Sequence, residues 1–300
     1  ISKELAAFGN VGIPLGGRLT LDAGARLFRS IVAEKRVVPG GRQRFEIRRN
    51  GMTPSLALSW RPGPDQLLFL RYGSAFRQGG SDISSTGQLE RLKGDELAMI
   101  EAGWRRTFAG GTRIDLGTWY GWWENLQSDR LQSNGLIETE NAGDARTMGG
   151  EASLTIALAR GWTLEAGGNV TIARLTRNEL GYELADRHLP VVPRYTLRGA
   201  VRHDFAIGRA EASLGMDLRY IGPSRLSFDP ALDRPMGELL ESGAEGRVKL
   251  DRLTLLLKAE NIFGRSGDVF AFGNSLRFAT MRQYTPQRPF RLSVSVQRGF

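Results

Sequence analysis

The imidazoles are the first side chains to consider for chemistry in this 300-residue chain, because the sequence contains two histidines and no cysteine. Neither His188 nor His203 lies near a serine nucleophile motif, and no G-x-S-x-G or H-E-x-x-H sequence occurs. The lack of cysteine removes thiol nucleophiles, thiolate metal sites and disulfides. We therefore expect neither an enzyme nor a metal or cofactor site.

Pairs of carboxylates are the second group that could react. Asp115 with Glu101, and Glu151 with Glu165, are predicted to face the same side of neighbouring segments, as the two acids of a glycosidase do. Basic residues alternate with them on that face, namely Arg26, Arg71, Arg105, Arg198, Arg202 and Arg219. Opposite charges on adjacent strands stabilise one another, so we expect ion pairing from these acids and not catalysis.

Arginines near two long connections form the third group. They are Arg36, Arg42, Arg44, Arg48 and Arg49 around one connection, and Arg77 before Gly79 and Gly80 at another. A guanidinium fork binds carboxylates and phosphates. The net charge of +9 would also suit nucleic acid, but the arginines are scattered and no basic helix or aromatic RNA-binding strand gathers them. We expect no nucleic-acid partner.

Alternation of apolar with polar or small residues predicts the elements that hold these groups. Between Ala210 and Ile221, alanine, leucine, methionine and tyrosine alternate with glutamate, serine, glycine, aspartate and arginine. Segments of about ten residues with this period are typical of membrane β-barrel strands. We count about 13 such strands, and no run approaches the roughly eighteen apolar residues of a membrane helix. The fold class expected is all-β, an antiparallel transmembrane β-barrel.

The connections between these strands alternate in length. Short ones are predicted at 13–17, 62–65, 109–111, 159–161, 207–209 and 251–252, and long ones at 30–44, 78–94, 125–145, 174–193, 222–241 and 264–289. Outer-membrane barrels have short periplasmic turns and long extracellular loops. A soluble β-sandwich or lipocalin-like barrel also alternates, but charge-dense polar faces and long loops on one side only favour the membrane barrel.

Residues that break the apolar face are predicted to lie at strand ends. Charged or imidazole residues of outward parity are Arg106, His203 and Arg298 beside short connections, and Arg29, Arg146 and Arg174 beside long ones. Aromatic residues of this parity gather at both rims, as in an interfacial belt. We expect His203 at the lipid interface. His188, beside Pro190 in a long loop, is expected either in solvent or against a ligand or metal.

Several ordered segments resemble the C-terminal barrel portion of TonB-dependent receptors. They are residues 4–9 (ELAAFG) with 19–28, 54–60 with 72–80 (YGSAFRQGG), 96–104, 141–151 (NAGDARTMGGE), 190–197 (PVVPRYTL), 219–222 (RYIG), 260–263 (ENIF) and 284–300. Two departures are minor: Ile262 stands for the usual leucine of Asn-Leu-Phe, and Gln287 before Arg288 breaks the usual Pro-Arg pair. The order and spacing of the segments make the resemblance specific.

The resemblance implies a barrel of 22 strands that encloses a plug and is preceded by a TonB box. This chain supplies about 13 strands and no plug, so we interpret residues 1–300 as the C-terminal part of that barrel, which should not close by itself. The implied partners are TonB and its inner-membrane energy complex through the missing N-terminal part, an extracellular small-molecule ligand, outer-membrane lipid and lipopolysaccharide, and the outer-membrane assembly machinery.

The function expected from this resemblance is TonB-energised uptake of a scarce ligand, commonly a ferric siderophore, across the outer membrane of a Gram-negative cell. Candidate ligand contacts are Arg42, Arg44, Arg48, Arg77, Trp123 and His188, and Phe300 is expected to serve barrel assembly. Anchoring to lipopolysaccharide phosphates is the alternative role of the loop arginines. The alternative functions are a passive porin or small closed barrel and, less favoured, an outer-membrane enzyme.

Overall fold

The computed structural model describes residues 1–38, 41–83, 89–131, 137–230, 233–268, 277, 281, 283 and 285–299. The long strands are β1 (Ser2–Gly16), β2 (Leu19–Val38), β3 (Gly41–Gly63), β4 (Gln66–Arg77), β7 (Asp95–Thr107), β8 (Arg113–Leu131), β9 (Ile137–Ala157), β10 (Trp162–Asn178), β11 (Tyr195–Ile207), β12 (Ala210–Ile221), β15 (Leu239–Leu250), β16 (Leu253–Glu260) and β17 (Arg291–Arg298). Short elements are β5 (Gly80–Ile83), β6 (Leu89–Leu92), β13 (Ser224–Arg225), β14 (Pro235–Met236) and the 3-10 turn η1 (Ala159–Gly161). Within these described ranges, no helix is long and apolar enough to span a membrane.

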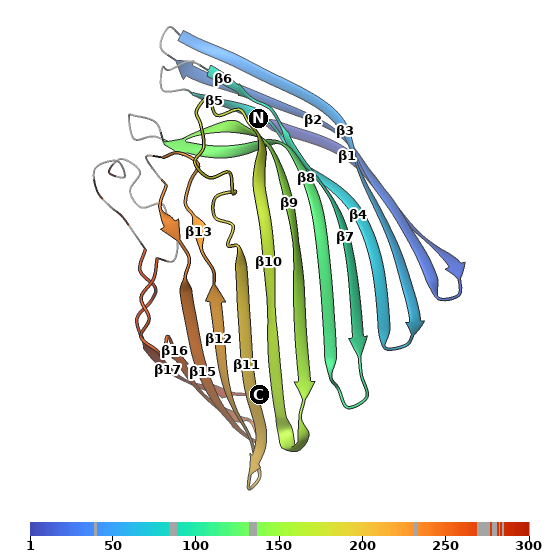
Figure 1. The fold of residues 1–300 in the computed structure, drawn as a ribbon, viewed down its shortest axis with the longest axis vertical. Coiled ribbons are helices and arrows are strands. Elements are labelled where there is room, and N and C mark those ends of the chain that lie inside the picture. Colours follow the sequence, from blue (N-terminus) through green and yellow to red (C-terminus); the bar gives the residue numbers. More distant parts are fainter. Residues whose placement is uncertain are drawn as a thin grey trace.

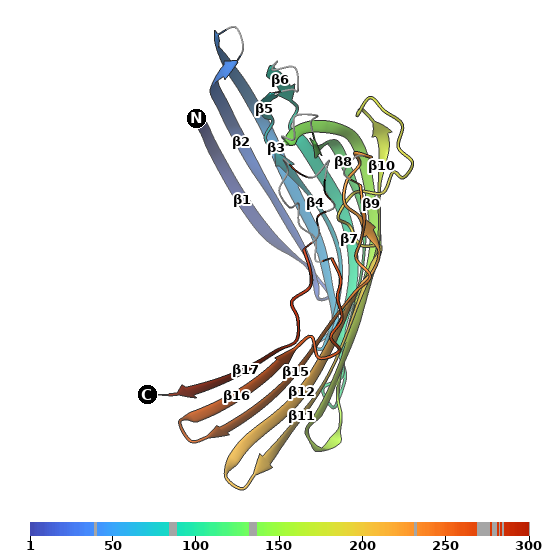
Figure 2. The same cartoon turned by 90° about the vertical axis from the view of Figure 1, so that its left-hand side faces the viewer.

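The 13 long strands form one antiparallel sheet in chain order, from β1 at one edge to β17 at the other. Each strand is hydrogen-bonded to the next long strand along the chain, so the sheet is a meander. The sheet curves like part of a barrel wall, and its two edge strands lie apart (Figures 1 and 2). This confirms the all-β class and the predicted number of strands.

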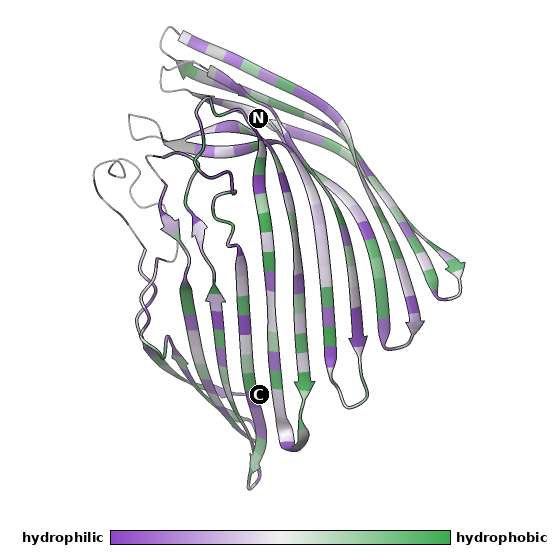
Figure 3. Ribbon diagram, viewed as in Figure 1, coloured by the Kyte–Doolittle hydropathy of each residue, from purple (hydrophilic) through white to green (hydrophobic). Residues whose placement is uncertain are grey.

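Two faces of different chemistry run along the sheet. The pairing of β11, β12 and β15 sets Leu214 opposite His203 and Gly246, and Leu214 is 57% exposed. Leu56 and Leu70, which are also exposed, belong to the same face. Hydrophilic and hydrophobic residues alternate along the strands (Figure 3). We call the apolar side the outer face, since lipid would cover it, and the polar side the inner face.

Tight connections join the strands at one end of the sheet, as predicted. Two-residue turns connect β1 to β2 and β11 to β12, and η1 connects β9 to β10. Gly161 has a φ of +80°, and a Cβ there would lie 2.1 Å from the carbonyl oxygen of Asp204. Only glycine fits such a close approach with positive φ. We call this the short-turn end.

The opposite, long-connection end differs from the sequence expectation. Residues 30–44 and 125–145 were expected as long connections, yet the β2–β3 pairing continues to Val38 opposite Gly41 and the β8–β9 pairing to Leu131 opposite Ile137. The small β5–β6 and β13–β14 pairs lie within two further expected loops. Beyond the apolar band both faces of a strand meet water, so the backbone ladder continues without needing apolar alternation.

A compact apolar cluster lies at the long-connection end. Its buried members are Leu126, Ala142, Ala145, Ala173, Leu175, Leu180, Leu189 and Phe228. They bring the ends of β8, β9 and β10 together with the connections that follow β10 and β13. These connections therefore pack against a protein core of their own.

Aromatic rings on the inner face lie over glycines on the neighbouring strand. The paired positions are Phe28 opposite Gly51, Phe69 opposite Gly103, and Trp119 opposite Gly149. A Cβ added to any of these glycines would lie 2.3–2.4 Å from a ring carbon of the partner. Each ring thus occupies the space that a side chain would fill.

Candidate ligand-binding site

Ion pairs between neighbouring strands line the inner face. The cross-strand pairs are Glu4 with Arg26, Arg71 with Glu101, Arg105 with Asp115 at 3.5 Å, Arg219 with Glu241 at 3.3 Å, and Glu211 with Lys249 at 3.6 Å. Both Glu101 and Asp115, considered above as possible catalytic acids, are therefore paired with arginine. The expectation of cross-strand charge pairing is confirmed for these two residues.

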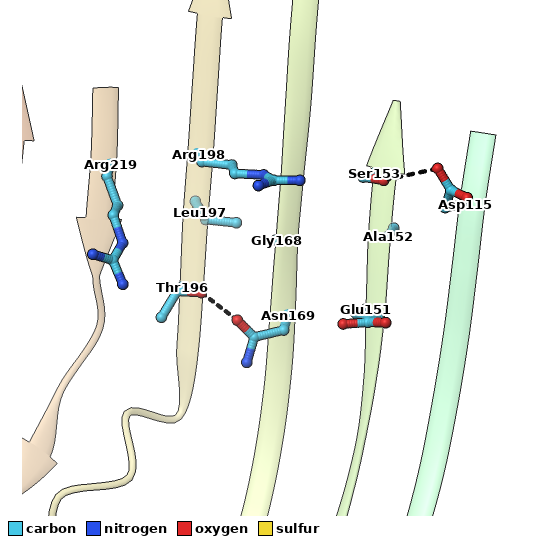
Figure 4. A pocket seen from close by; sticks show the side chains of 10 residues that line it. All are labelled: Asp115, Glu151, Ala152, Ser153, Gly168, Asn169, Thr196, Leu197, Arg198 and Arg219. Carbon is cyan, nitrogen blue, oxygen red and sulfur yellow. Dashed lines mark hydrogen bonds between the residues drawn. The ribbon is translucent and has the colours of Figure 1, made fainter. Parts of the chain in front are cut away.

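A polar hollow of about 520 Å³ lies in the middle of this wall (Figure 4). Its charged lining consists of Asp115 and Glu151 on one side and Arg198 and Arg219 on the other. The Thr196 hydroxyl donates to Asn169 Oδ1, and the Ser153 hydroxyl donates to Asp115 Oδ2 at 3.4 Å. With two acids and two bases, the hollow is polar but close to neutral in charge.

A second hollow, of about 290 Å³, lies at the long-connection end. The inner side of the β2–β3 hairpin forms one wall with Ser30, Val32, Ile47 and Arg49. The other wall consists of Gln78 just after β4, Arg91 in β6 and Lys93 just after β6. Four of its lining residues are basic, counting Arg48, and none is acidic. We call it the mouth hollow. Its charge suits an anionic ligand.

Neighbouring groups hold two of the basic residues around the mouth hollow and leave a third free. Arg49 donates to Glu96 at 3.3 Å and lies 5.2 Å from the ring centroid of Phe76. The Lys93 ammonium is 3.5 Å from Glu179, and amide side chains on β8 and β9 hold its backbone. Arg91 is exposed and has no ion-pair partner among the described residues. Its guanidinium is therefore open to an added anion.

Arg77 and Trp123, two expected ligand contacts, meet at one buried carboxylate. Arg77 donates to both oxygens of Asp95, at 2.9 and 2.8 Å, and the Trp123 indole donates to Asp95 Oδ2 at 2.9 Å. Asp95 has 3% of its side chain exposed, whereas Arg77 keeps 55%. The bonds join the end of β4 and the start of β7 to β8 beside the mouth hollow.

Comparison with known proteins identifies the family. A family model described as TonB dependent receptor-like, beta-barrel matches residues 2–254. The chain belongs to the TonB-dependent receptor family. The sequence resemblance noted above is thereby confirmed, and members of this family are transporters and not enzymes, as expected. No curated protein matches the sequence.

Solved structures of TonB-dependent receptors share the fold. The ferric yersiniabactin uptake receptor FyuA from Yersinia pestis superposes with a TM-score of 0.82 at 18% identity, over all of this chain and 46% of that chain. The copper transporter OprC gives 0.75 at 15% identity over 100% and 48% of the two chains. The ferric-catecholate import receptor Fiu from E. coli K12 gives 0.73 at 16% over 100% and 45%. The chain spans just under half of each structure.

Three other expected contacts lie on the outer side of the receptor wall. Arg42, Arg44 and Arg48 alternate along β3 in the same parity as Met52 and Leu56, which are exposed on the outer face. Arg44 and Arg48 both bind the carboxylate of Glu46, at 2.9 and 2.7 Å. The structure thus separates them from Arg77 and Trp123, although Arg48 also borders the mouth hollow.

The two histidines lie at opposite ends of the sheet. His188 Nδ1 is 2.6 Å from Asp186, which also accepts the His188 backbone N–H at 2.9 Å. Burial works to raise the pKa of Asp186, but these His188 hydrogen bonds outweigh it and lower that pKa. His203 stacks on Trp162 at 4.2 Å and Phe205 at 5.1 Å on the outer face near the short-turn end. This agrees with an interfacial His203.

Sequence reasoning missed Arg91 and Lys93, because residues 78–94 were expected as one loop. Leu89, Arg91 and Leu92 belong to β6, which pairs with β5, and Lys93 follows it. The two leucines within the expected loop were the signal that could have indicated a short strand there. The described residues hold no cluster of three or more acidic or imidazole groups that would suit a metal. Phe300, expected to serve assembly, lies outside the described residues.

Proposed function

We propose that residues 1–300 form the C-terminal part of the barrel of an outer-membrane receptor that imports a scarce ligand with energy from TonB. The family supports the transport class. The mouth hollow supports an anionic ligand, since four basic side chains and no acidic one line it. We infer that the cargo is a ferric siderophore whose carboxylate or phosphate groups bind guanidinium and ammonium donors.

The long-connection end would face the outside of the cell, and the short-turn end the periplasm. The similar receptors carry different cargoes by name, ferric complexes in FyuA and Fiu and copper in OprC. The fold therefore does not set the cargo by itself, and we infer that side chains at the mouth do so. Within this chain we propose Arg91, Lys93 and Arg49 as anion contacts, with Arg77, Trp123 and His188 along the route of the ligand.

The partners follow from the proposed transport. TonB and its inner-membrane energy complex would act on the N-terminal part of the receptor, which precedes a barrel portion of this kind. Polar residues around the hollow in Figure 4 would then face the plug or the passing ligand. The outer-membrane assembly machinery and outer-membrane lipid are partners that any such barrel requires.

Ligand binding to the full-length, detergent-purified receptor tests the proposal. A panel of ferric siderophores and other solutes is titrated by tryptophan fluorescence, and saturable submicromolar binding of one of them is expected. Replacing both Arg91 and Lys93 by glutamine should weaken this binding by about ten-fold or more, since hydrogen bonds to charged groups contribute about 1.5–3 kcal/mol.

The control variant removes two charges at the short-turn end, Arg61→Gln with Arg209→Gln, and should leave affinity unchanged. Unaltered affinity in the Arg91 and Lys93 variant would refute the mouth hollow as the binding site. Absence of saturable binding by any solute, together with ion conductance in planar bilayers, would favour a passive porin instead.

A further inference from the structure

A third hollow, of about 270 Å³, lies at the long-connection end beside the compact apolar cluster. Eight of its twelve lining residues are apolar and none is basic. Leu126, Leu226 and Phe228 form its buried part, with 4–6% of each residue exposed, whereas the lining residue Val191 is 44% exposed. The hollow therefore reaches the surface at Val191 and is not sealed inside the core. We call it the apolar hollow.

The polar groups of the lining are already used by the protein. The Trp123 indole N–H donates to Asp95, so the ring offers only apolar surface. The Gln127 side-chain amide donates to two backbone carbonyls, at 3.0 and 3.4 Å, and Asp129 Oδ1 accepts from the Thr139 hydroxyl at 2.9 Å. What remains for a ligand is mostly apolar surface, whose burial would drive binding.

The backbone on both sides of the apolar hollow is held in place. Val191 has a φ of +64°, which a β-branched residue rarely adopts, and its N–H donates to the Arg225 carbonyl at 2.7 Å. On the other side Asn125, next to Leu126 in a β-bulge of β8, donates its N–H to Asp144 at 3.0 Å. Strain of the kind seen at Val191 concentrates at ligand sites. The walls are thus fixed before a ligand arrives.

The apolar hollow and the mouth hollow share one wall, a short segment of β8. Asn125 lines the mouth hollow, and the next residue, Leu126, lines the apolar hollow. Gln127 also lines the apolar hollow, and its amide donates to the carbonyls of Gln78 and Lys93, which line the mouth hollow. An extended residue spans about 3.3 Å, so groups in the two hollows would lie on the order of 10 Å apart. One small molecule can reach both.

We propose that the apolar hollow takes an aromatic ring of the imported ligand, while an anionic group of the same molecule occupies the mouth hollow. Trp123, Phe228 and Pro190 have flat side chains, which pack well against a planar ring. A cavity of about 150 Å³ lined by apolar residues binds benzene, so this larger hollow admits a substituted ring. The inference rests on the proposed function and narrows its cargo to anionic ligands that also carry an aromatic ring.

A fluorophenyl-hexanoate probe, added to the full-length, detergent-purified receptor, tests this assignment. The probe joins a carboxylate to a ring by a flexible chain, and its matched partners are hexanoate, which lacks the ring, and fluorophenyl-hexanol, which lacks the carboxylate. Fluorine NMR reports binding of the ring compounds, competition reports hexanoate, and empty micelles give the baseline. Burial of the ring should make the probe bind about ten-fold or more tighter than hexanoate. Loss of the carboxylate should weaken binding by a similar factor.

The hollow variant is Ser128→Phe, which fills the hollow from a half-buried lining position. It should reduce the affinity of the probe to that of hexanoate. The control, Thr118→Phe, adds the same ring to β8 on the outer face, in the parity of the exposed Leu116, and should change nothing. A second variant, Val191→Asn, makes the edge of the hollow polar, and asparagine tolerates the positive φ. It should weaken binding of the probe but not of hexanoate.

Equal affinity of the probe and hexanoate would overturn the aromatic subsite, as would an unaltered probe affinity in whichever of the two hollow variants folds. The anion site of the proposed function would survive that result if Arg91→Gln with Lys93→Gln still weakens hexanoate. Equal binding of the probe and fluorophenyl-hexanol would also overturn the proposal, because the two hollows would then not act on one molecule. Siderophore titrations on the same samples report separately on the proposed import.

Discussion

The part of the sheet that would cross the membrane and the long-connection end above it are stabilised differently. In the first, large apolar residues such as Leu214 and Leu70 are more than half exposed, because lipid is the medium that would cover them. In the second, Leu175 and Leu189 are buried among protein side chains. Apolar side chains therefore face outward where lipid would surround the sheet, and they are buried inside the protein where water would surround it.

The largest effect is expected where the long-connection end buries its core. Leu175→Ala should cost about 2–5 kcal/mol, because Leu175 is 2% exposed and its removal leaves a cavity. The loss should be local, so limited proteolysis should cut residues 179–194 while the barrel keeps its resistance to detergent. Leu164→Ala, on the outer face of the same strand β10, is the control and should leave these residues protected. Equal proteolysis of both variants would contradict separate stabilisation of the two parts.

The lipid-facing side is tested by charge. Leu214→Arg should impair barrel assembly, since arginine on the lipid face costs about 2–4 kcal/mol at the midplane. Ser213→Arg, the adjacent residue on the inner face opposite Asp204, should be tolerated. The readout is the amount of folded receptor in outer membranes. Similar losses in both variants would show that the faces are assigned wrongly.

The inner face should respond to small changes in volume. Gly103→Ala should destabilise the barrel by about 1–3 kcal/mol, because its Cβ would lie 2.3 Å from the Phe69 ring. Gly73→Ala, on the adjacent strand β4, meets nothing within 4 Å and serves as the control. Urea unfolding of the receptor in lipid measures both. Indistinguishable midpoints would mean that the ring moves aside without cost.

The smallest effect is expected at the junction of the two parts. Asp95→Asn should cost about 1 kcal/mol, because the indole of Trp123 keeps an acceptor while Arg77 loses its ionic partner. Tryptophan emission and unfolding midpoint report this change. Asp204→Asn is the control, since Asp204 is exposed and binds Arg202 within its own strand. A larger loss at Asp204 would reverse the expected ranking.

Alternation predicted the part of the fold that lipid constrains. Strand number, the short turns and the outward parity of His203 and Arg106 follow from a period of two, because each outward residue must suit lipid. Above the apolar band this constraint ends. The continuation of β2 and β3 as a paired hairpin could therefore not be predicted from the alternation of apolar and polar residues.

The candidate site was harder to predict than the fold. The mouth hollow combines Arg49 with Arg91 and Lys93, which are more than forty residues away in sequence, and the meeting of Arg77 with Trp123 depends on Asp95 of a third strand. Such contacts come from cross-strand pairing and cannot be found from spacing along one segment. The outward parity of Arg44 and Arg48, by contrast, was present in their even spacing from Met52.

The rings that cover glycines on the inner face have a consequence for how neighbouring hairpins find one another during membrane insertion. A slip of one residue turns apolar side chains inward and is rejected by hydrophobicity, but a slip of two residues keeps every side chain on its proper face. Such a slip of β4 along β7 would place Phe69 against Glu101 or Arg105 in place of Gly103. The glycines therefore disfavour strand pairings that are shifted by an even number of residues. Hydrophobicity alone would not distinguish such pairings from the correct one.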